Sequence, residues 1–420
     1  MKLLIIIISF IYSCVSLFAQ EPVLKLTLHD AEQIFLKRNL SLIASKYDID
    51  LAEAQVTQAR LFENPVISLE QNVYNRLNGK YFDIGKEGEA AVEIEQVINL
   101  AGQRNKRVRL EKINREIACY QFEEVLRTLR SELNKTFVEI VFASRSLGIY
   151  DREVNSLENL LQAFELHQDK GNISLMERSR LESLLLSLRK EKSELENHII
   201  ELRCEFNLLL NMPADQHIEL LLDDEVLHGL YLSFLSFKDM EGLLVSRPDL
   251  KMARSGMEAA KANLKLQRSL AAPECSLKGM YDRAGNFINN YFAVGVSLSI
   301  PIFNRNQGNI KSAKTEICKT GREEELAVEK AQMELYSAYE RLQKNIDLYR
   351  TTNGKLEHNF DKLMDGAALN YQRRNISLLE FIDYYQSYKE ACLQLFELKK
   401  NVFLAMEDLN MIVGQTVFNY

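Results

Sequence analysis

Two acidic residues, Glu380 and Asp383, lie three positions apart, and their carboxylates could act together on a cation. They follow the segment 375–379 (NISLL), which predicts a turn and then the start of a helix. Residues three apart share one face of a helix, so the two negative charges would point the same way and favour cations. A purely structural explanation is equally open, because the helix dipole favours carboxylates near a helix N-terminus without any ligand.

Other kinds of chemistry find no support in the composition. The six histidines and six cysteines are scattered, without an HExxH or CxxC spacing, and no phosphate loop or nucleophile–base spacing is present. The net charge of −7 gives no reason to expect a polyanionic partner such as nucleic acid. We therefore expect no enzyme activity, no cofactor, no metal site and no nucleic-acid partner.

The N-terminus predicts export. Met1 and Lys2, the apolar run 3–11 and the sequence 17–19 (LFA) have the order of a secretory signal peptide covering residues 1–19. An alternative interpretation uses 11–14 (IYSC) as a lipoprotein box, with a lipid on Cys14. After residue 19 no apolar stretch approaches the roughly 18 residues that a membrane helix needs. If the mature chain crosses a membrane, it does so with strands.

The mature chain contains one unit twice. At an offset of 208, Pro65 and Leu69 fall on Pro273 and Leu277, and at 203 the run 172–175 (NISL) falls on 375–378 (NISL). We expect a first repeat over 20–212, a linker over 213–237 that packs around the middle of the helices, and a second repeat over 238–420.

Each repeat has the same predicted order of elements. A first helix, 28–62 or 239–270, ends before a proline, and a β-hairpin with a polar, glycine-bearing loop follows. Alternating apolar and polar residues predict strands at about 65–74 and 90–99, and at about 273–281 and 291–301. Glu93 and Glu95 alternate with apolar residues, which indicates that the polar face of the sheet meets water.

Long helices follow the hairpins. Proline-free stretches run from near Gly102 to about His167 and from near Gly308 to about Tyr371. A helix of about 65 residues spans roughly 100 Å. After a turn, further helices of about 35 residues begin near Ser174 and Ser377, and the first carries a leucine stripe typical of lateral helix packing.

Two hairpins give only four strands per chain, and four strands cannot close a barrel. In hydrocarbon every backbone N–H and C=O must be paired, so open sheet edges are excluded from the membrane. A membrane barrel built from these hairpins must therefore be shared between chains.

These features together resemble the TolC family of outer-membrane efflux proteins. The signal peptide, the duplicated plan, the strand-to-helix passage 296–303 (VSLSIPIF) and the turn 375–380 (NISLLE) carry the resemblance. It implies a mostly α-helical protein with a membrane β-barrel part, in which a homotrimer places a twelve-stranded barrel on a twelve-helix periplasmic tunnel. The passage 296–303 is most similar to the branch of cation-efflux components, although drug-efflux members share the pattern.

The resemblance also implies partners and a gate. A periplasmic adaptor and an inner-membrane pump would deliver metal cations or drugs to the channel in the outer-membrane lipid. Acidic family residues that match Glu380 and Asp383 ring the closed tip of the tunnel, with Glu177 and Tyr371 as weaker matches. Ile376 stands where a close relative has a latching arginine, a role that the adjacent arginines 373 and 374 could fill.

Two alternatives stay open. A type I protein-secretion channel would have the same fold. A non-conducting periplasmic coiled-coil protein would explain the helices, but it leaves unexplained the two proline-bounded hairpins at matching points of the repeats.

Overall fold

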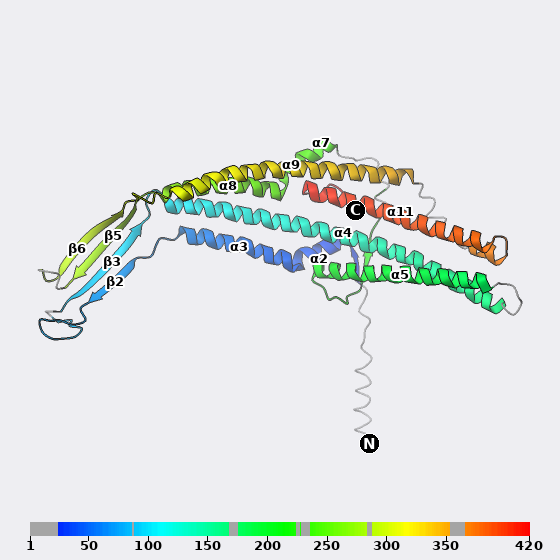
Figure 1. The fold of residues 1–420 in the computed structure, drawn as a ribbon, viewed down its shortest axis with the longest axis horizontal. Helices are drawn as coiled ribbons and strands as arrows, with labels where there is room; N and C mark the ends of the chain where they lie inside the picture. Colours follow the sequence, from blue (N-terminus) through cyan, green and yellow to red (C-terminus); the bar gives the residue numbers. More distant parts are fainter. Residues whose placement is uncertain are drawn as a thin grey trace, which may run out of the picture.

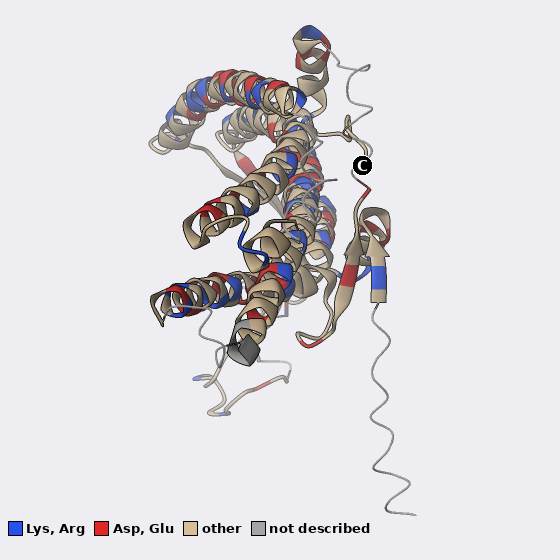
Figure 2. Cartoon of the chain, turned by 90° about the vertical axis from the view of Figure 1, so that its right-hand side faces the viewer, with Lys and Arg blue, Asp and Glu red and all other residues tan. Residues whose placement is uncertain are grey.

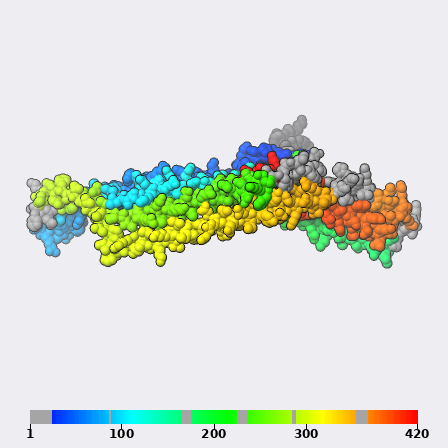
Figure 3. All heavy atoms as spheres, turned by 90° about the horizontal axis from the view of Figure 1, so that it is seen from above, coloured from blue at the N-terminus to red at the C-terminus, as the bar shows by residue number. Residues whose placement is uncertain are grey.

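A computed structural model describes residues 24–85, 88–167, 175–223, 227, 236–283, 288–352 and 366–420. The molecule is elongated, with a β-sheet at one end and two helical hairpins pointing away from it at the other (Figures 1 and 3). The predicted signal peptide and Cys14 lie outside the described residues. Within these residues, no helix is both long enough and apolar enough to cross a membrane.

The longest helix, α4 (Gln103–His167), has 65 residues, which confirms the length predicted for the first repeat. Its counterpart α9 (Gln307–Thr351) has 45 residues, so the prediction of one uninterrupted helix to Tyr371 was wrong. Thr352 has an extended backbone (ψ 114°), and the hydroxyls of Thr351 and Thr352 both donate to the Leu348 carbonyl at 2.9 Å. Such side-chain bonds compete with helix continuation.

The first helix of each repeat is broken, which corrects the predicted single helices 28–62 and 239–270. In the first repeat, α2 (Leu28–Arg38) and α3 (Leu40–Arg60) are separated by Asn39, whose side-chain oxygen accepts from the Leu42 N–H at 2.8 Å. In the second, α7 (Phe237–Leu243) and a short 3₁₀ turn, η2 (Leu244–Ser246), precede α8 (Pro248–Ser269). Pro248 forces the residue before it out of the helical region.

The two predicted hairpins join into one antiparallel sheet in the order β2-β3-β5-β6. Its strands are β2 (Val66–Gln71), β3 (Ala90–Ile98), β5 (Glu274–Asp282) and β6 (Tyr291–Ser299). Three of them lie within two residues of the predicted bounds. β2 is shorter than the predicted 65–74, because Asn72 accepts from the Tyr74 N–H at 3.0 Å and the chain then forms its own small hairpin, with a bridge between Tyr74 and Tyr81.

The register of the sheet gives it one apolar face. Directly paired residues share a face, and two rows on this face cross all four strands. The rows are Ile67, Ile94, Gly279 and Val294, and Leu69, Val92, Tyr281 and Phe292. Leu69, Phe292 and Val294 are 77%, 76% and 88% exposed in the single chain. A sheet with so much exposed apolar surface needs a non-aqueous neighbour.

A second, parallel sheet was not predicted from the sequence. It pairs β1 (Leu24–Thr27), at the start of the first repeat, with β4 (Ile218–Leu221), which belongs to the segment 213–237. β4 also contacts α4. This part of the linker therefore joins the first repeat near the middle of the long helices (Figure 1).

The helices form a row rather than a closed bundle. Nearer the sheet, α4 packs between α3 and α8, and α9 packs on α8. Farther from it, α4 packs between α5 (Leu175–Leu210) and α11 (Leu378–Val413), and α11 also contacts α9. Viewed from the end, the helices lie side by side with acidic and basic residues interspersed along them (Figure 2). The starts of α5 and α11 agree with the predicted positions.

Candidate functional site

The predicted acidic pair lies at the tip of α11, where Ser377 is the N-cap. The Glu380 carboxylate accepts hydrogen bonds from the Ser377 N–H and hydroxyl, both at 2.8 Å, and the Glu380 N–H donates to the Ser377 hydroxyl at 3.3 Å. This is a capping box, the structural role that the sequence left open. The bonds from the backbone and hydroxyl of Ser377 lower the pKa of Glu380. Its charge is therefore held at the tip.

Capping does not remove Glu380 from solvent. Glu380 and Asp383 are both exposed, and they lie three residues apart near the start of α11. Each copy of the chain therefore presents two carboxylates to water at the end of the molecule farthest from the sheet (Figure 1). Glu380 therefore has a structural role, and both carboxylates stay exposed to solvent.

The two weaker candidates, Tyr371 and Glu177, lie near this pair. Tyr371 is 8% exposed, and its ring stacks on Phe381 with centroids 5.1 Å apart. Burial raises the pKa of Tyr371 to about 12, with a smaller contribution from the charge of Glu177. Glu177 is half-buried in the first turn of α5. Tyr371 therefore packs on α11 within range of the charge of Glu177 on α5.

The turn before α11 is ordered by its own backbone. The Arg373 N–H donates to Leu369 at 3.0 Å, and Arg374 adopts a left-handed conformation with φ 61°. Ile376 packs against the hydrophobic core, so an apolar contact stands where the family comparison had an arginine. The charge of Arg374 lowers the pKa of Tyr371, against the larger effect of burial. The matching turn, 172–174, lies outside the described residues.

A buried cluster of charged residues near the tip was not predicted from the sequence. Glu153 of α4 is 1% exposed, and neither of its carboxylate oxygens has a hydrogen-bond partner in the part of the chain that the structure describes. Burial raises the pKa of Glu153 to about 8, and Lys389 opposes part of that rise. A carboxyl group in such a position is stable in its neutral form near neutral pH.

The neighbours of Glu153 come from three helices. Lys389 of α11, 8% exposed, forms an ion pair with Glu191 of α5 at 2.9 Å. The Tyr150 hydroxyl donates to Glu191 at 3.2 Å, and the Tyr385 hydroxyl donates to the Glu153 backbone carbonyl at 2.6 Å. We call these five residues the seam cluster, because they join the α4–α5 pair to α11. Charges inside an apolar stripe, such as Lys389 four residues after Tyr385, are the sequence signal that could have revealed it.

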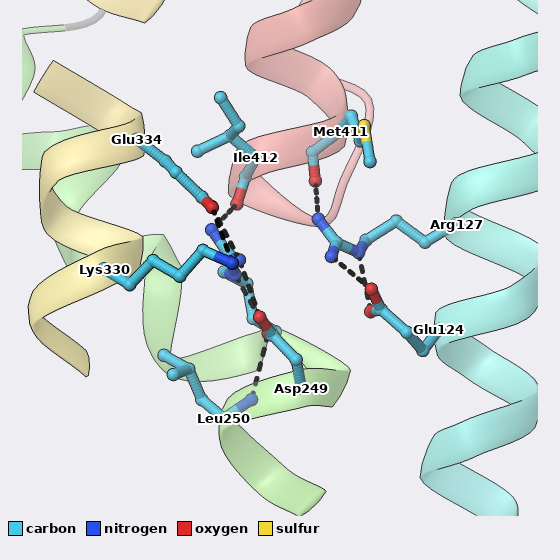
Figure 4. Close-up of polar contacts among 9 residues, drawn as sticks. Glu124, Arg127, Asp249, Leu250, Lys330, Glu334, Met411 and Ile412 are labelled. Carbon is cyan, nitrogen blue, oxygen red and sulfur yellow. Dashed lines mark hydrogen bonds and ion pairs between the residues drawn. The ribbon is translucent and has the colours of Figure 1, made fainter. Parts of the chain in front are cut away.

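Two arginines hold the other end of α11 (Figure 4). Arg247, 3% exposed, contacts Asp249 at 2.6 Å and Glu334 at 3.0 Å, and it donates to the Ile412 carbonyl at 3.3 Å. Arg127 of α4 pairs with Glu124 and donates to the Met411 carbonyl. Positive charge at a helix C-terminus satisfies its free carbonyls and its dipole. The end of α11 away from the tip is therefore fixed to α4, α8 and α9.

The polar face of the sheet carries its own charges. Lys278 of β5 contacts Glu93 at 2.9 Å and Glu95 at 3.1 Å on β3. These residues lie on the face opposite the apolar rows, as expected from the alternation in the sequence. A sheet with one apolar and one charged face can separate hydrocarbon from water.

Comparisons with known proteins agree on one family. The model of a family described as "Outer membrane efflux protein" matches residues 32–203 and 240–414. The cobalt-zinc-cadmium resistance protein CzcC of Cupriavidus metallidurans is 22% identical over 302 residues, which cover 72% of this chain and 69% of CzcC. The pyoverdine export outer membrane protein OpmQ of Pseudomonas aeruginosa is 24% identical over 233 residues, covering 52% of this chain and 46% of OpmQ.

Solved structures share the fold. A crystal structure of CusC has a TM-score of 0.74 at 18% identity, covering 92% of each chain. The outer membrane protein VceC of Vibrio cholerae has a TM-score of 0.71 at 16% identity, covering 92% of this chain and 96% of VceC.

Proposed function

Since the chain belongs to the outer membrane efflux protein family, we propose that three copies form one channel, with a shared β-barrel in the outer membrane and a helical tunnel in the periplasm. The observation that carries the proposal is the four-stranded sheet, because its apolar face is exposed and its order leaves β2 and β6 as edges. An edge strand cannot stay unpaired in lipid, so β6 of one copy would pair with β2 of the next. The number three comes from the family resemblance.

The mass of the purified protein in detergent and its conductance in planar bilayers test this proposal. We expect a particle three times the mass of the chain that dissociates to monomers on heating in SDS, and discrete conductance steps in the bilayer. A monomer without conductance would favour the coiled-coil structural protein instead.

The tip of α11 supports a second part of the proposal, a gate. Three copies would bring six carboxylates from Glu380 and Asp383 to the end of the tunnel, with Tyr371 and Glu177 nearby. Crowded negative charge at a constriction favours cations and binds multivalent cations that block flow. Because Glu380 also caps α11, the informative variant is E380Q/D383N, since glutamine can still complete a capping box.

The matched control removes two charges elsewhere on the same helix. Glu390 and Glu397 are exposed on α11, so E390Q/E397Q makes an equal change of charge away from the tip. We expect cation preference and block by multivalent cations to fall in E380Q/D383N and to stay unchanged in the control. Equal selectivity in all three proteins would refute the gate.

For the substrate, we propose metal cations delivered by an inner-membrane pump through a periplasmic adaptor. The support is the similarity to CzcC, whose name states resistance to cobalt, zinc and cadmium, and the sequence 296–303. A strain lacking the protein should lose tolerance to these metals and regain it with the intact gene. The match to OpmQ, whose name states pyoverdine export, favours a second candidate substrate, pyoverdine or a similar molecule, and its secretion should be measured in the same strains. Retention of a protein substrate instead would indicate type I secretion.

A further inference from the structure

Positive charge is concentrated where the helices meet the sheet. Three segments, 104–115, 261–268 and 305–314, together hold twelve basic residues and one acidic residue, although the whole chain has a net charge of −7. We call these segments the basic collar. Its basic residues are Arg104, Lys106, Arg107, Arg109, Lys112, Arg115, Lys261, Lys265, Arg268, Arg305, Lys311 and Lys314.

The fold brings the collar to one level of the molecule. Residues 104–115 form the first turns of α4, 261–268 the last turns of α8, and 305–314 the residues before α9 and its first turns. These helices lead directly from or into β3, β5 and β6, and they lie side by side at this end (Figure 1). Segments that are far apart in the sequence thus form a continuous basic band beside the sheet.

An exposed apolar rim lies between the sheet and the collar. Phe62 and Phe303 are 76% and 93% exposed, and Ile300 and Ile302 are 63% and 61% exposed. The Arg104 guanidinium lies 3.9 Å from the centre of the Phe62 ring. Aromatic side chains followed by cations are the arrangement that suits the boundary between hydrocarbon and headgroups.

Part of the collar is hollowed and its charge is not neutralised. Lys106, Arg109, Lys261 and Lys265 line a cavity of about 290 Å³ between α4 and α8, together with the exposed carboxylate of Glu258. Lys106 donates to the Ala101 carbonyl at 2.9 Å. Arg109, Lys261 and Lys265 have no ion pair in the described part of the chain, so four cations face one carboxylate. An anion with several oxygens fits this site better than a cation or an apolar group.

We propose that the basic collar binds the phosphate headgroups of anionic phospholipids in the membrane leaflet that faces the periplasm. The inference rests on the proposed function in one respect, the placement of the sheet's apolar face in the membrane. That placement puts the apolar rim at the edge of the hydrocarbon and the collar at the depth of the phosphates. Each Lys or Arg near an anionic membrane surface strengthens binding several-fold, and the effect weakens as salt increases.

Lipid competition tests the collar. Purified wild-type protein in mixed micelles with equal amounts of phosphatidylglycerol and phosphatidylcholine, matched in acyl chains, should retain phosphatidylglycerol several-fold in excess by mass spectrometry. In K106Q/R109Q/K261Q/K265Q the excess should disappear or fall close to equal retention of the two lipids. The control K190Q/R322Q/K330Q/K344Q removes the same charges from exposed positions on α5 and on α9 beyond the collar, and it should keep the wild-type preference. Raising the salt from 50 to 500 mM should weaken the wild-type preference.

Three results would overturn the proposal. They are equal retention of the two lipids by the wild type, an unchanged preference in the collar variant, and a shift of ion selectivity toward cations in the collar variant, which would place the collar in the water-filled lumen. If the fourfold variant fails to fold, K261Q/K265Q makes the same test with a smaller expected effect. Lipid retention does not depend on conductance, so failure of the channel proposal and failure of the collar proposal are distinguishable.

Discussion

Carboxylates are held in opposite ways at the tip of α11 and in the seam cluster. Glu380 is exposed and bonded to Ser377, and these bonds lower its pKa. Glu153 is 1% exposed without a hydrogen-bond partner among the described residues, and burial raises its pKa to about 8. Water and an N-cap therefore keep the charge at the tip, whereas the seam cluster favours a neutral carboxyl group. The surroundings of each glutamate, on α4 or on α11, therefore decide whether its side chain carries a charge.

The two regions should respond to pH with opposite signs. Below the ordinary pKa of 4.5 the unfolded chain takes up a proton that the folded Glu380 does not, so the contribution of the tip to the free energy of unfolding is lost as the pH falls through the lowered pKa. Glu153 has a raised pKa in the folded protein, so the folded state binds more protons than the unfolded state between 4.5 and about 8. The contribution of the seam cluster to the free energy of unfolding therefore falls as the pH rises from 4.5 to about 8.

The largest expected effect is this pH dependence of the seam cluster. Between pH 5 and pH 8, the free energy of unfolding of the wild type should fall by on the order of 3 kcal/mol more than that of E153Q, which cannot ionise. Urea denaturation at several pH values measures the difference. Parallel pH profiles in the two proteins would show that the burial of Glu153 does not affect the stability of the fold.

Next in size is the loss of the cation in the seam cluster. Lys389→Ala leaves Glu191 without its ion-pair partner and should reduce the free energy of unfolding by about 2 kcal/mol, less than for a fully buried pair because the Glu191 side chain is 38% exposed. Lys190→Ala, which removes a 75% exposed side chain from the same bundle, is the control and should cost less than about 0.5 kcal/mol. Similar losses from both variants would contradict the burial argument.

A smaller effect is expected at the tip from Ser377→Ala. Loss of the N-cap hydroxyl should lower the free energy of unfolding by about 1 kcal/mol, since two hydrogen bonds of the capping box disappear. Ser387→Ala, at an exposed position inside α11, should be neutral or slightly stabilising because alanine is the better helix former. Thermal unfolding of the two variants side by side measures the contribution of the cap.

The smallest effect on stability should come from Glu380→Gln. Glutamine preserves the capping geometry, so the free energy of unfolding at pH 7 should stay close to that of the wild type. Ion selectivity should nevertheless shift, because one carboxylate per chain is lost at the tip. A large loss of stability without a change in ion selectivity would show that Glu380 has only a structural role.

Much of the architecture was predictable from local signals. Pro65 and Pro273 indicated where the helices give way to strands, and the alternation around Glu93 predicted the two faces of the sheet. The 65 residues of α4 followed from the absence of proline. The break at Pro248 was also available in the sequence and was missed. The secondary structure could be predicted at these positions because a single backbone preference determines it.

The seam cluster, the small parallel sheet and the basic collar needed tertiary structure. Three helices supply Glu153, Glu191 and Lys389, and the sequence around each residue does not indicate that packing brings them together. The pairing of β1 with β4 joins residues almost two hundred positions apart. Only the adjacent ends of α4, α8 and α9 turn three basic segments into one band.

By itself the sequence determined the duplicated plan, the four strands per chain, the long helices and the acidic pair at the start of α11. Each of these depends on hydrophobic period, proline position or residue spacing, which act within a few residues of one another. The tertiary structure decided which charges are buried. Glu153 and Glu380 are the same residue type, and their difference comes from the helices packed around one and the water around the other. Burial is a property of the assembled helices, and it sets the pKa.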